Sequence, residues 1–215
     1  MERGSPVADD FYLVAHEERS GRCLVPQRVA SLGLAAGLLA ELVLSGHVQV
    51  INGRVFHRHA PAPPQDRVSR ELLALVFETG AGAGVGNWLD LLTSNAVRNV
   101  RYRLTLAGSL TEVQIPRMLR RRRRAHLPTD PNAAAWPAIR LANALSGGEP
   151  MTTEDMVLSS LVAVTGLLDS VLWLKPDHEP GFLRAAVVRQ ALPAGLGELV
   201  AHVDVAVGRA VLAGR

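Results

Sequence analysis

The amino-acid sequence predicts a mainly α-helical single domain, with a central apolar helical core, surrounding amphipathic helices and one or two β-hairpins. Of the 215 residues, 48% are hydrophobic and 20% are charged, as in an ordinary globular protein. Only 4% are aromatic, and Ala, Leu, Val and Gly supply most of the apolar content. This composition favours packed helices over a β-sandwich, and apolar residues recur with helical spacing in the long segments.

The N-terminal part of the chain is expected to contain the central helix of the core. We expect residues 1–10 to form a flexible tail and residues 11–215 to form one helical domain, opened by a short apolar segment at Phe11–Ala15. The following segment, Val29–Ser45, is apolar on nearly every side, as expected of a helix in the middle of a domain. It is shorter than the roughly 20 residues of a membrane span, and Glu41 interrupts its end.

The next elements follow from local patterns. Asn52-Gly53 between two β-branched segments predicts a hairpin over Val48–Phe56, because a type I′ turn needs positive φ at both central residues. Thr152 and Asp155 form a plausible helix cap. Helices are expected over Val68–Glu78, Asn87–Leu92, Ala96–Leu104, Ala133–Leu145, Thr152–Leu174, Pro180–Leu192 and Leu196–Leu212.

Arginines are concentrated in one stretch of the chain. The net charge is only +3, but nine of the 22 arginines lie between Arg98 and Arg124. Arg98 and Arg101 are three residues apart on a predicted helix and can therefore reach one ligand. Such a dense cationic surface points to an anionic partner, although a solvated charged loop stays an alternative.

No set of residues predicts catalysis or metal binding. The carboxylates are scattered singly, and Cys23, the only cysteine, has no neighbour that would activate a thiolate. His57 and His59 share a strand face but have no obvious third ligand. We therefore expect a non-enzymatic protein with no cofactor and no metal. The N-terminus has no secretory signal pattern, so a cytoplasmic location is expected.

Three blocks of sequence, in this order, resemble the Golgi phosphoprotein 3 family. Leu38–Val48 is similar to its "LLxELALxGRI" block, and Asn87–Leu92 is similar to its "NWIELL" block. Arg98–Leu104 followed by Gly108–Leu110 is similar to "RNVRERL…GVL". With matching spacing into the last two core helices, the similarity covers about residues 11 to 212.

The resemblance implies a mainly α fold and peripheral membrane binding through phosphatidylinositol 4-phosphate. In the family, the two arginines of the "RNVR" block contact the lipid phosphate, and these positions are Arg98 and Arg101 here. Pro26 stands where the family has its pocket tryptophan, and Ala35 stands where it has an earlier pocket arginine. Arg28 is the candidate to replace part of the missing charge.

The family also has an apolar, membrane-inserting hairpin after the "GVL" block, and this chain departs from it. The corresponding region, Thr111–His126, carries an arginine run, and only Ile115, Met118 and Leu119 are apolar candidates. A polybasic segment gains about 1 kcal/mol per residue near an anionic bilayer. We therefore expect a membrane-contacting loop made of Arg117, Met118, Leu119, Arg120, Arg121, Arg122, Arg123 and Arg124, with an anionic phospholipid surface as partner and peripheral membrane association as location.

Three alternatives stay open from the sequence. Arg98 and Arg101 could form internal salt bridges with Asp90 or Glu41. The chain could bind nucleic acid through the same arginine run, because arginines favour backbone phosphates and a helix followed by an Asn-Gly hairpin resembles a winged-helix fragment, although that helix is too apolar to read bases. A protein–protein adaptor or self-assembling scaffold is the third class, suggested by the family's adaptor role, with protein cargo or self-association as its partners.

Overall fold

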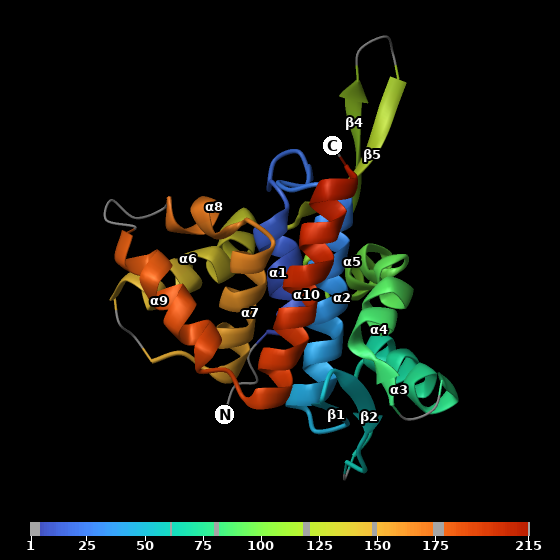
Figure 1. Cartoon of the computed structure of the whole chain (residues 1–215). Coiled ribbons are helices and arrows are strands. Elements are labelled where there is room, and N and C mark those ends of the chain that lie inside the picture. The colour runs from blue at the N-terminus through green and yellow to red at the C-terminus, as the bar shows by residue number, and fades with distance from the viewer. Residues whose placement is uncertain are drawn as a thin grey trace.

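The computed structural model describes residues 5–60, 62–79, 82–117, 121–147, 150–173 and 179–214. Its fold is mainly α-helical, as predicted (Figure 1). The helices are α1 Val7–Ala15, α2 Gln27–Leu44, α3 Arg67–Thr79, α4 Val85–Thr93, α5 Ala96–Leu106, α6 Pro131–Gly147, α7 Thr153–Val164, α8 Leu168–Leu172, α9 Glu179–Gln190 and α10 Ala194–Ala213. The strands are β1 Val48–Ile51, β2 Arg54–His57, β3 Ala83–Gly84, β4 Leu110–Arg117 and β5 Arg121–Pro128.

Helix α2 is the centre of the domain, as the sequence predicted. It packs against α1, α4, α5, α7 and α10 (Figure 1). Leu34, Leu38, Leu39 and Leu42 are almost fully buried. By length and composition, α2 is also the one described helix that could cross a bilayer, but 72% of it is buried inside the domain. Because neighbours surround it, α2 cannot enter a DNA groove, which removes the basis of the winged-helix interpretation.

Two glycines of α2 allow a close helix–helix contact. A Cβ at Gly37 would lie 2.9 Å from the Cα of Ala8, and a Cβ at Gly33 would overlap the ring of Phe11. Helix α1 therefore lies directly on the backbone of α2. We expected residues 1–10 to be a flexible tail, and this is wrong for residues 7–10, because α1 begins at Val7 and Val7, Ala8, Asp9 and Asp10 are buried.

The β-strands form two separate sheets. Strands β1 and β2 pair as the predicted hairpin, with φ of 51° at Asn52 and 68° at Gly53, and β3 adds to β2. Strands β4 and β5 pair antiparallel, from Leu110 with Pro128 to Arg117 with Arg121. This second hairpin projects beyond the helical body (Figure 1).

One predicted helix is broken in two. The sequence suggested a continuous helix over Thr152–Leu174, capped by Thr152. The cap is present, since the Thr152 Oγ1 accepts a hydrogen bond from the Asp155 N–H at 3.1 Å. However, α7 ends at Val164, because Gly166 adopts a φ of 77° and the chain turns into the short helix α8.

Candidate functional site

Helix α5 carries three arginines in three different environments. Its inner face buries Ala96, Val100 and Leu104 against the core, and Val97 is half-buried. Arg98 is exposed, Arg101 is half-buried and Arg103 is 9% exposed. The helix ends before Gly108, whose φ of 73° turns the chain into β4.

Arg101 is held by an aromatic residue of α1. Its Nε donates a hydrogen bond to the Tyr12 hydroxyl at 3.0 Å, and its guanidinium carbon lies 5.8 Å from the centre of the Tyr12 ring. Burial raises the pKa of Tyr12, and Arg101 opposes this rise because a nearby cation favours the phenolate. Since one nitrogen is engaged by a neutral oxygen, the positive charge of Arg101 is not neutralised by that contact.

His16, directly after α1, packs against Tyr12 on the side of the loop that follows this helix. Its ring stacks on Tyr12 with centroids 4.0 Å apart, and its Nδ1–H donates to the Tyr12 carbonyl at 2.8 Å. Its buried Nε2 has no hydrogen-bond partner in the described residues, as suits the lone-pair nitrogen of a neutral imidazole. Burial lowers the pKa of His16 to about 4, and Arg101 adds to that effect. Burial and Arg101 also lower the pKa of His126 on β5.

Arg98 and Arg28 are open to solvent. Neither has an ion pair or side-chain hydrogen bond within the described ranges. Arg28 lies in the first turn of α2 and shares no partner with Arg98 or Arg101 there. The alternative that Arg98 and Arg101 pair with Asp90 or Glu41 is not what the structure has, because Glu41 binds another arginine.

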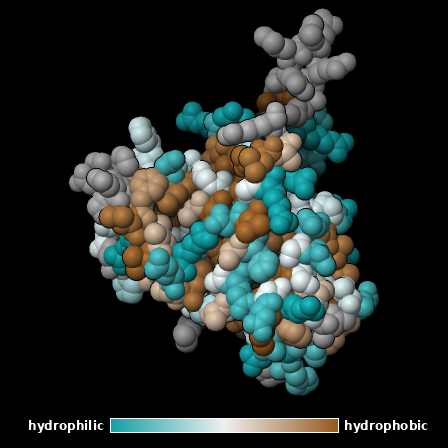
Figure 2. Space-filling view, in the orientation of Figure 1, coloured by the Kyte–Doolittle hydropathy of each residue, from teal (hydrophilic) through white to brown (hydrophobic). Residues whose placement is uncertain are grey.

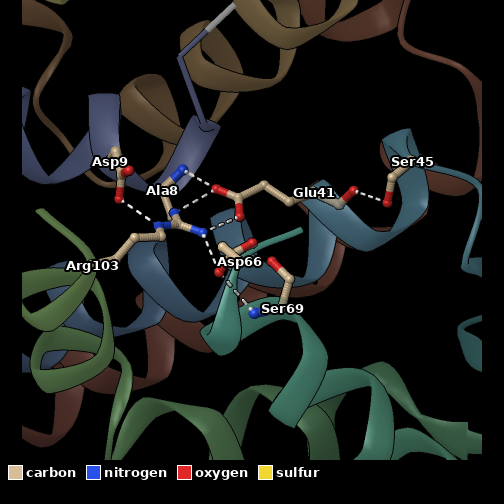
Figure 3. A network of polar contacts seen from close by, with 7 residues as sticks. All are labelled: Ala8, Asp9, Glu41, Ser45, Asp66, Ser69 and Arg103. Atoms are coloured by element: carbon tan, nitrogen blue, oxygen red, sulfur yellow. Dashed lines mark hydrogen bonds and ion pairs between the residues drawn. The ribbon is translucent and has the colours of Figure 1, made fainter. Parts of the chain in front are cut away.

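That arginine is Arg103, and sequence reasoning missed it. Its Nη1 lies 2.7 Å from Oε2 of Glu41, its Nη2 lies 2.9 Å from Oε1, and its Nε lies 2.9 Å from Oδ1 of Asp9 (Figure 3). The Ala8 N–H also donates to Glu41 Oε1 at 2.8 Å, and Asp66 is 3.7 Å from Arg103. The sequence feature that could have revealed this ion pair is Glu41, a charged residue in a mostly apolar helix. A buried carboxylate needs a partner.

The network has more acids than bases. Three carboxylates face one guanidinium, so they cannot all be neutralised. Burial raises the pKa of Asp9 to about 7, although Arg103 opposes this, and burial also raises the pKa of Glu41. The network therefore ties α1, α2 and α5 together and leaves no charge of Arg103 for a ligand.

The arginine run lies on a paired strand. We expected a membrane-contacting loop over Arg117–Arg124, but Arg117 ends β4 and Arg121, Arg122, Arg123 and Arg124 form the first half of β5. Met118, Leu119 and Arg120 lie outside the described residues. At 78% side-chain exposure, Arg124 forms a surface ion pair with Glu112, with Nε and Oε1 3.3 Å apart.

The base of this hairpin is fixed to the body near Arg101. Leu110 and Ala125 are buried, and a Cβ at Gly21 would lie 2.8 Å from the His126 carbonyl oxygen. Gly21 has a φ of 61°, so glycine is favoured there on two grounds. The loop after α1 thus packs against β5.

Chemically, this arrangement suits the binding of an anion. Guanidinium groups match phosphate oxygens in geometry, and they stay charged at any physiological pH. No group of three or more His, Cys, Asp or Glu side chains in the described part of the chain is placed to hold a metal ion.

Comparison with known proteins gives the family. The model of the family described as Golgi phosphoprotein 3 (GPP34) matches residues 7–211, nearly the whole chain. Comparison with individual curated proteins finds no match. Because the match extends from the start of α1 to Val211 in the last turn of α10, this chain belongs to the Golgi phosphoprotein 3 family.

Proposed function

We propose that this protein is a non-enzymatic peripheral membrane protein that binds anionic phospholipid headgroups from the cytoplasmic side. Arg98 and Arg101 bind the lipid phosphate, Arg28 adds charge, and the basic hairpin attracts the bilayer. The family suggests lipid-binding adaptors in general terms, with lipid and protein partners. The headgroup that the family resemblance suggests is phosphatidylinositol 4-phosphate.

The observation that carries this proposal is the division of charge along α5. Arg103 is buried and neutralised by Glu41 and Asp9. Arg98 and Arg101, on the same helix, have no acidic partner among the described residues. Because no acidic side chain neutralises these two guanidiniums within the described residues, their charge is available to an external anion.

The position of the hairpin supports the same function. Its base lies beside the Tyr12 side chain that holds Arg101, since Leu110 and His126 line one small pocket with Tyr12 and His16, and the arginines of β5 lie further along the hairpin. Pro26 precedes α2, and Ala35 is fully buried inside it. Neither position offers a polar side chain, so recognition depends more on charge than on a shaped inositol pocket.

Vesicle flotation with the full chain tests the proposal. Replacing both arginines (Arg98→Ala with Arg101→Ala) should weaken binding to phosphatidylglycerol vesicles at least about tenfold, since each cation near the surface contributes about 1 kcal/mol. The matched control, Arg58→Ala with Arg70→Ala, removes the same charge from exposed sites elsewhere and should bind normally. Equal flotation of the first variant and the wild type, with both folded, would overturn the proposal.

Two further comparisons in the flotation assay test which lipid chemistry the protein binds. Binding should fall as ionic strength rises, because exposed charges are screened within about 10 Å at 0.1 M salt. Vesicles containing phosphatidylinositol 4-phosphate, matched in charge to phosphatidylglycerol vesicles, distinguish a specific headgroup site from general adsorption. A preference that Arg98→Ala with Arg101→Ala abolishes assigns the specificity to these two side chains.

A further inference from the structure

An open cavity of about 720 Å³ lies where the β1–β2 turn, β3, α4 and α10 meet. Its walls include the turn at residues 52–54, the segment at residues 82–84, Asn87 of α4, and Glu198 and His202 of α10. We call this space the turn cavity. Its volume is within the range of about 300–1,000 Å³ that is usual for small-molecule sites.

The turn cavity and the candidate lipid site lie at different ends of the domain. Strands β1 and β2 lie at one end of the helical body, and the β4–β5 hairpin leaves the body at the other end (Figure 1). Figure 2 shows mostly hydrophilic surface at the end that bears β1 and β2. A protein held on a membrane by its basic hairpin therefore keeps this cavity in water, where a polar, soluble ligand has access to it.

Two glycines leave room beside the polar side chains of the turn cavity. The φ angles are 68° at Gly53 and 89° at Gly82, a region that favours glycine. A Cβ at Gly53 would lie 2.9 Å from Cε1 of His202 and 3.0 Å from its Nε2. A Cβ at Gly82 would lie 3.9 Å from Nη1 of Arg54. The backbone therefore approaches both side chains closely without filling the space between them.

Two side chains of opposite charge line the turn cavity without neutralising each other. Nη1 of Arg54 donates a hydrogen bond to the Gly82 carbonyl oxygen at 3.1 Å. Oε2 of Glu198 accepts one from the Gly53 N–H at 2.6 Å. Neither side chain forms an ion pair within the described residues. Because both contacts are to neutral backbone groups, each side chain is held in position and keeps its charge for an external group.

His202 adds a hydrogen-bond acceptor on the side of Glu198. The two residues are four apart on α10 and therefore share a face of the helix. Nδ1–H of His202 donates to the Glu198 carbonyl oxygen at 2.8 Å, so Nε2 of the neutral ring carries the lone pair. The α10 wall thus offers a carboxylate and an imidazole lone pair, which suit an ammonium group. The hairpin wall offers the guanidinium of Arg54, which suits a carboxylate.

We propose that the turn cavity binds a small zwitterion, a molecule that carries both an ammonium group and a carboxylate group, as amino acids do. Glu198 and His202 accept hydrogen bonds from the ammonium group, and Arg54 donates to the carboxylate. A ligand with a single charge leaves one of the two charged side chains without a partner, so the cavity selects molecules with both charges. The site shares no residue with the lipid site and does not depend on the proposed function.

An NMR titration of the full chain, labelled with nitrogen-15, tests this site. The probes are glycine, β-alanine, 4-aminobutyrate and 6-aminohexanoate, in which a lengthening chain separates the two charges. The alkylamine and the carboxylate of matching length are the single-charge analogues. The amide signals of Gly53, Gly82 and His202 should shift with at least one zwitterion. Its affinity should exceed that of either analogue at least about tenfold, because each analogue lacks one charge-assisted contact.

Two variants remove one charge each. Glu198→Gln keeps an oxygen that accepts from the Gly53 N–H, and it should bind the zwitterion no more tightly than the carboxylate analogue. Arg54→Gln should bind the zwitterion no more tightly than the alkylamine. The matched control, Arg58→Gln with Glu78→Gln, removes one charge of each sign from exposed positions that do not line the turn cavity. It should bind like the wild type.

Three results would overturn the turn cavity as a zwitterion site. The first is the absence of shifts at these amides with all four zwitterions up to about 20 mM, which is above the range of weak specific binding. The second is equal affinity for a zwitterion and a single-charge analogue. The third is unchanged affinity in Glu198→Gln and Arg54→Gln. Both variants should float with phosphatidylglycerol vesicles like the wild type, so failure here leaves the proposed function intact.

Discussion

Arg103 and Glu41, 62 residues apart in the sequence, form a two-pronged ion pair with N–O distances of 2.7 and 2.9 Å. The pair joins α5 to α2, and Asp9 brings α1 to the same guanidinium. Both side chains are largely withdrawn from water, so the pair is strong only as long as it is complete.

Replacing Arg103 should therefore strongly destabilise the folded protein. Arg103→Met should lower the free energy of unfolding by about 3–5 kcal/mol, because it leaves the carboxylates of Glu41 and Asp9 buried without a counter-charge. Urea denaturation at neutral pH measures this. Arg98→Met is the control, and it should change the free energy by less than about 0.5 kcal/mol because Arg98 is exposed.

Asp9 should give the stability a pH dependence of unusual sign. Burial raises the pKa of its carboxyl to about 7, from 3.8. Between these values the folded state holds a proton that the unfolded state has released, so this group's contribution decreases as pH rises from about 4 to about 7. Asp9→Asn mimics the protonated acid. Its unfolding free energy relative to the wild type should increase over that range, and a constant difference would contradict this account.

His16 should give the folding stability a pH dependence of the opposite sign. Burial lowers its pKa to about 4, from 6.5, so below pH 6.5 the unfolded state takes up a proton that the folded state refuses. This contribution is present above pH 6.5 and is lost as pH falls towards 4, by up to about 3 kcal/mol. His16→Phe keeps a ring against Tyr12 without a titrating group. Chemical denaturation across this range should show a weaker acid destabilisation in the variant.

Tyr12 should matter for lipid binding through Arg101. Tyr12→Phe removes the hydroxyl that accepts from Arg101 Nε at 3.0 Å and keeps the buried ring. A freed guanidinium loses more rotamer entropy when it binds phosphate, so vesicle binding should weaken about two- to tenfold. Flotation against Arg101→Ala separates the effects: in that background, Tyr12→Phe should add nothing.

The α1–α2 contact predicts opposite effects for two helical glycines. Gly37→Ala should destabilise by about 1–3 kcal/mol, because the new Cβ would lie 2.9 Å from the backbone of Ala8. Gly208→Ala, on α10, meets no atom within 4 Å and should stabilise by about 1 kcal/mol through helix propensity alone. Thermal unfolding of the two variants provides the comparison.

The sequence by itself determined the elements whose cause is local. The mostly apolar surface of Val29–Ser45 predicted a central helix, and Asn52-Gly53 predicted a type I′ hairpin, because each depends on neighbouring residues only. The order of motifs identified the family, and the spacing of Arg98 and Arg101 placed both on one helix. The break at Gly166 was missed because a single glycine inside a helical pattern is tolerated as often as it ends a helix.

Only the tertiary structure decided which arginines of α5 are neutralised. Arg98, Arg101 and Arg103 look alike in the sequence, and Glu41 was named as a partner for the wrong two. Whether each arginine has an acidic partner depends on which side of α5 faces α1 and α2. It therefore depends on contacts between residues as distant in the sequence as Asp9 and Arg103. The same physical reason, the packing of segments distant in the sequence, turned part of the expected tail into α1, which lies on the backbone of α2.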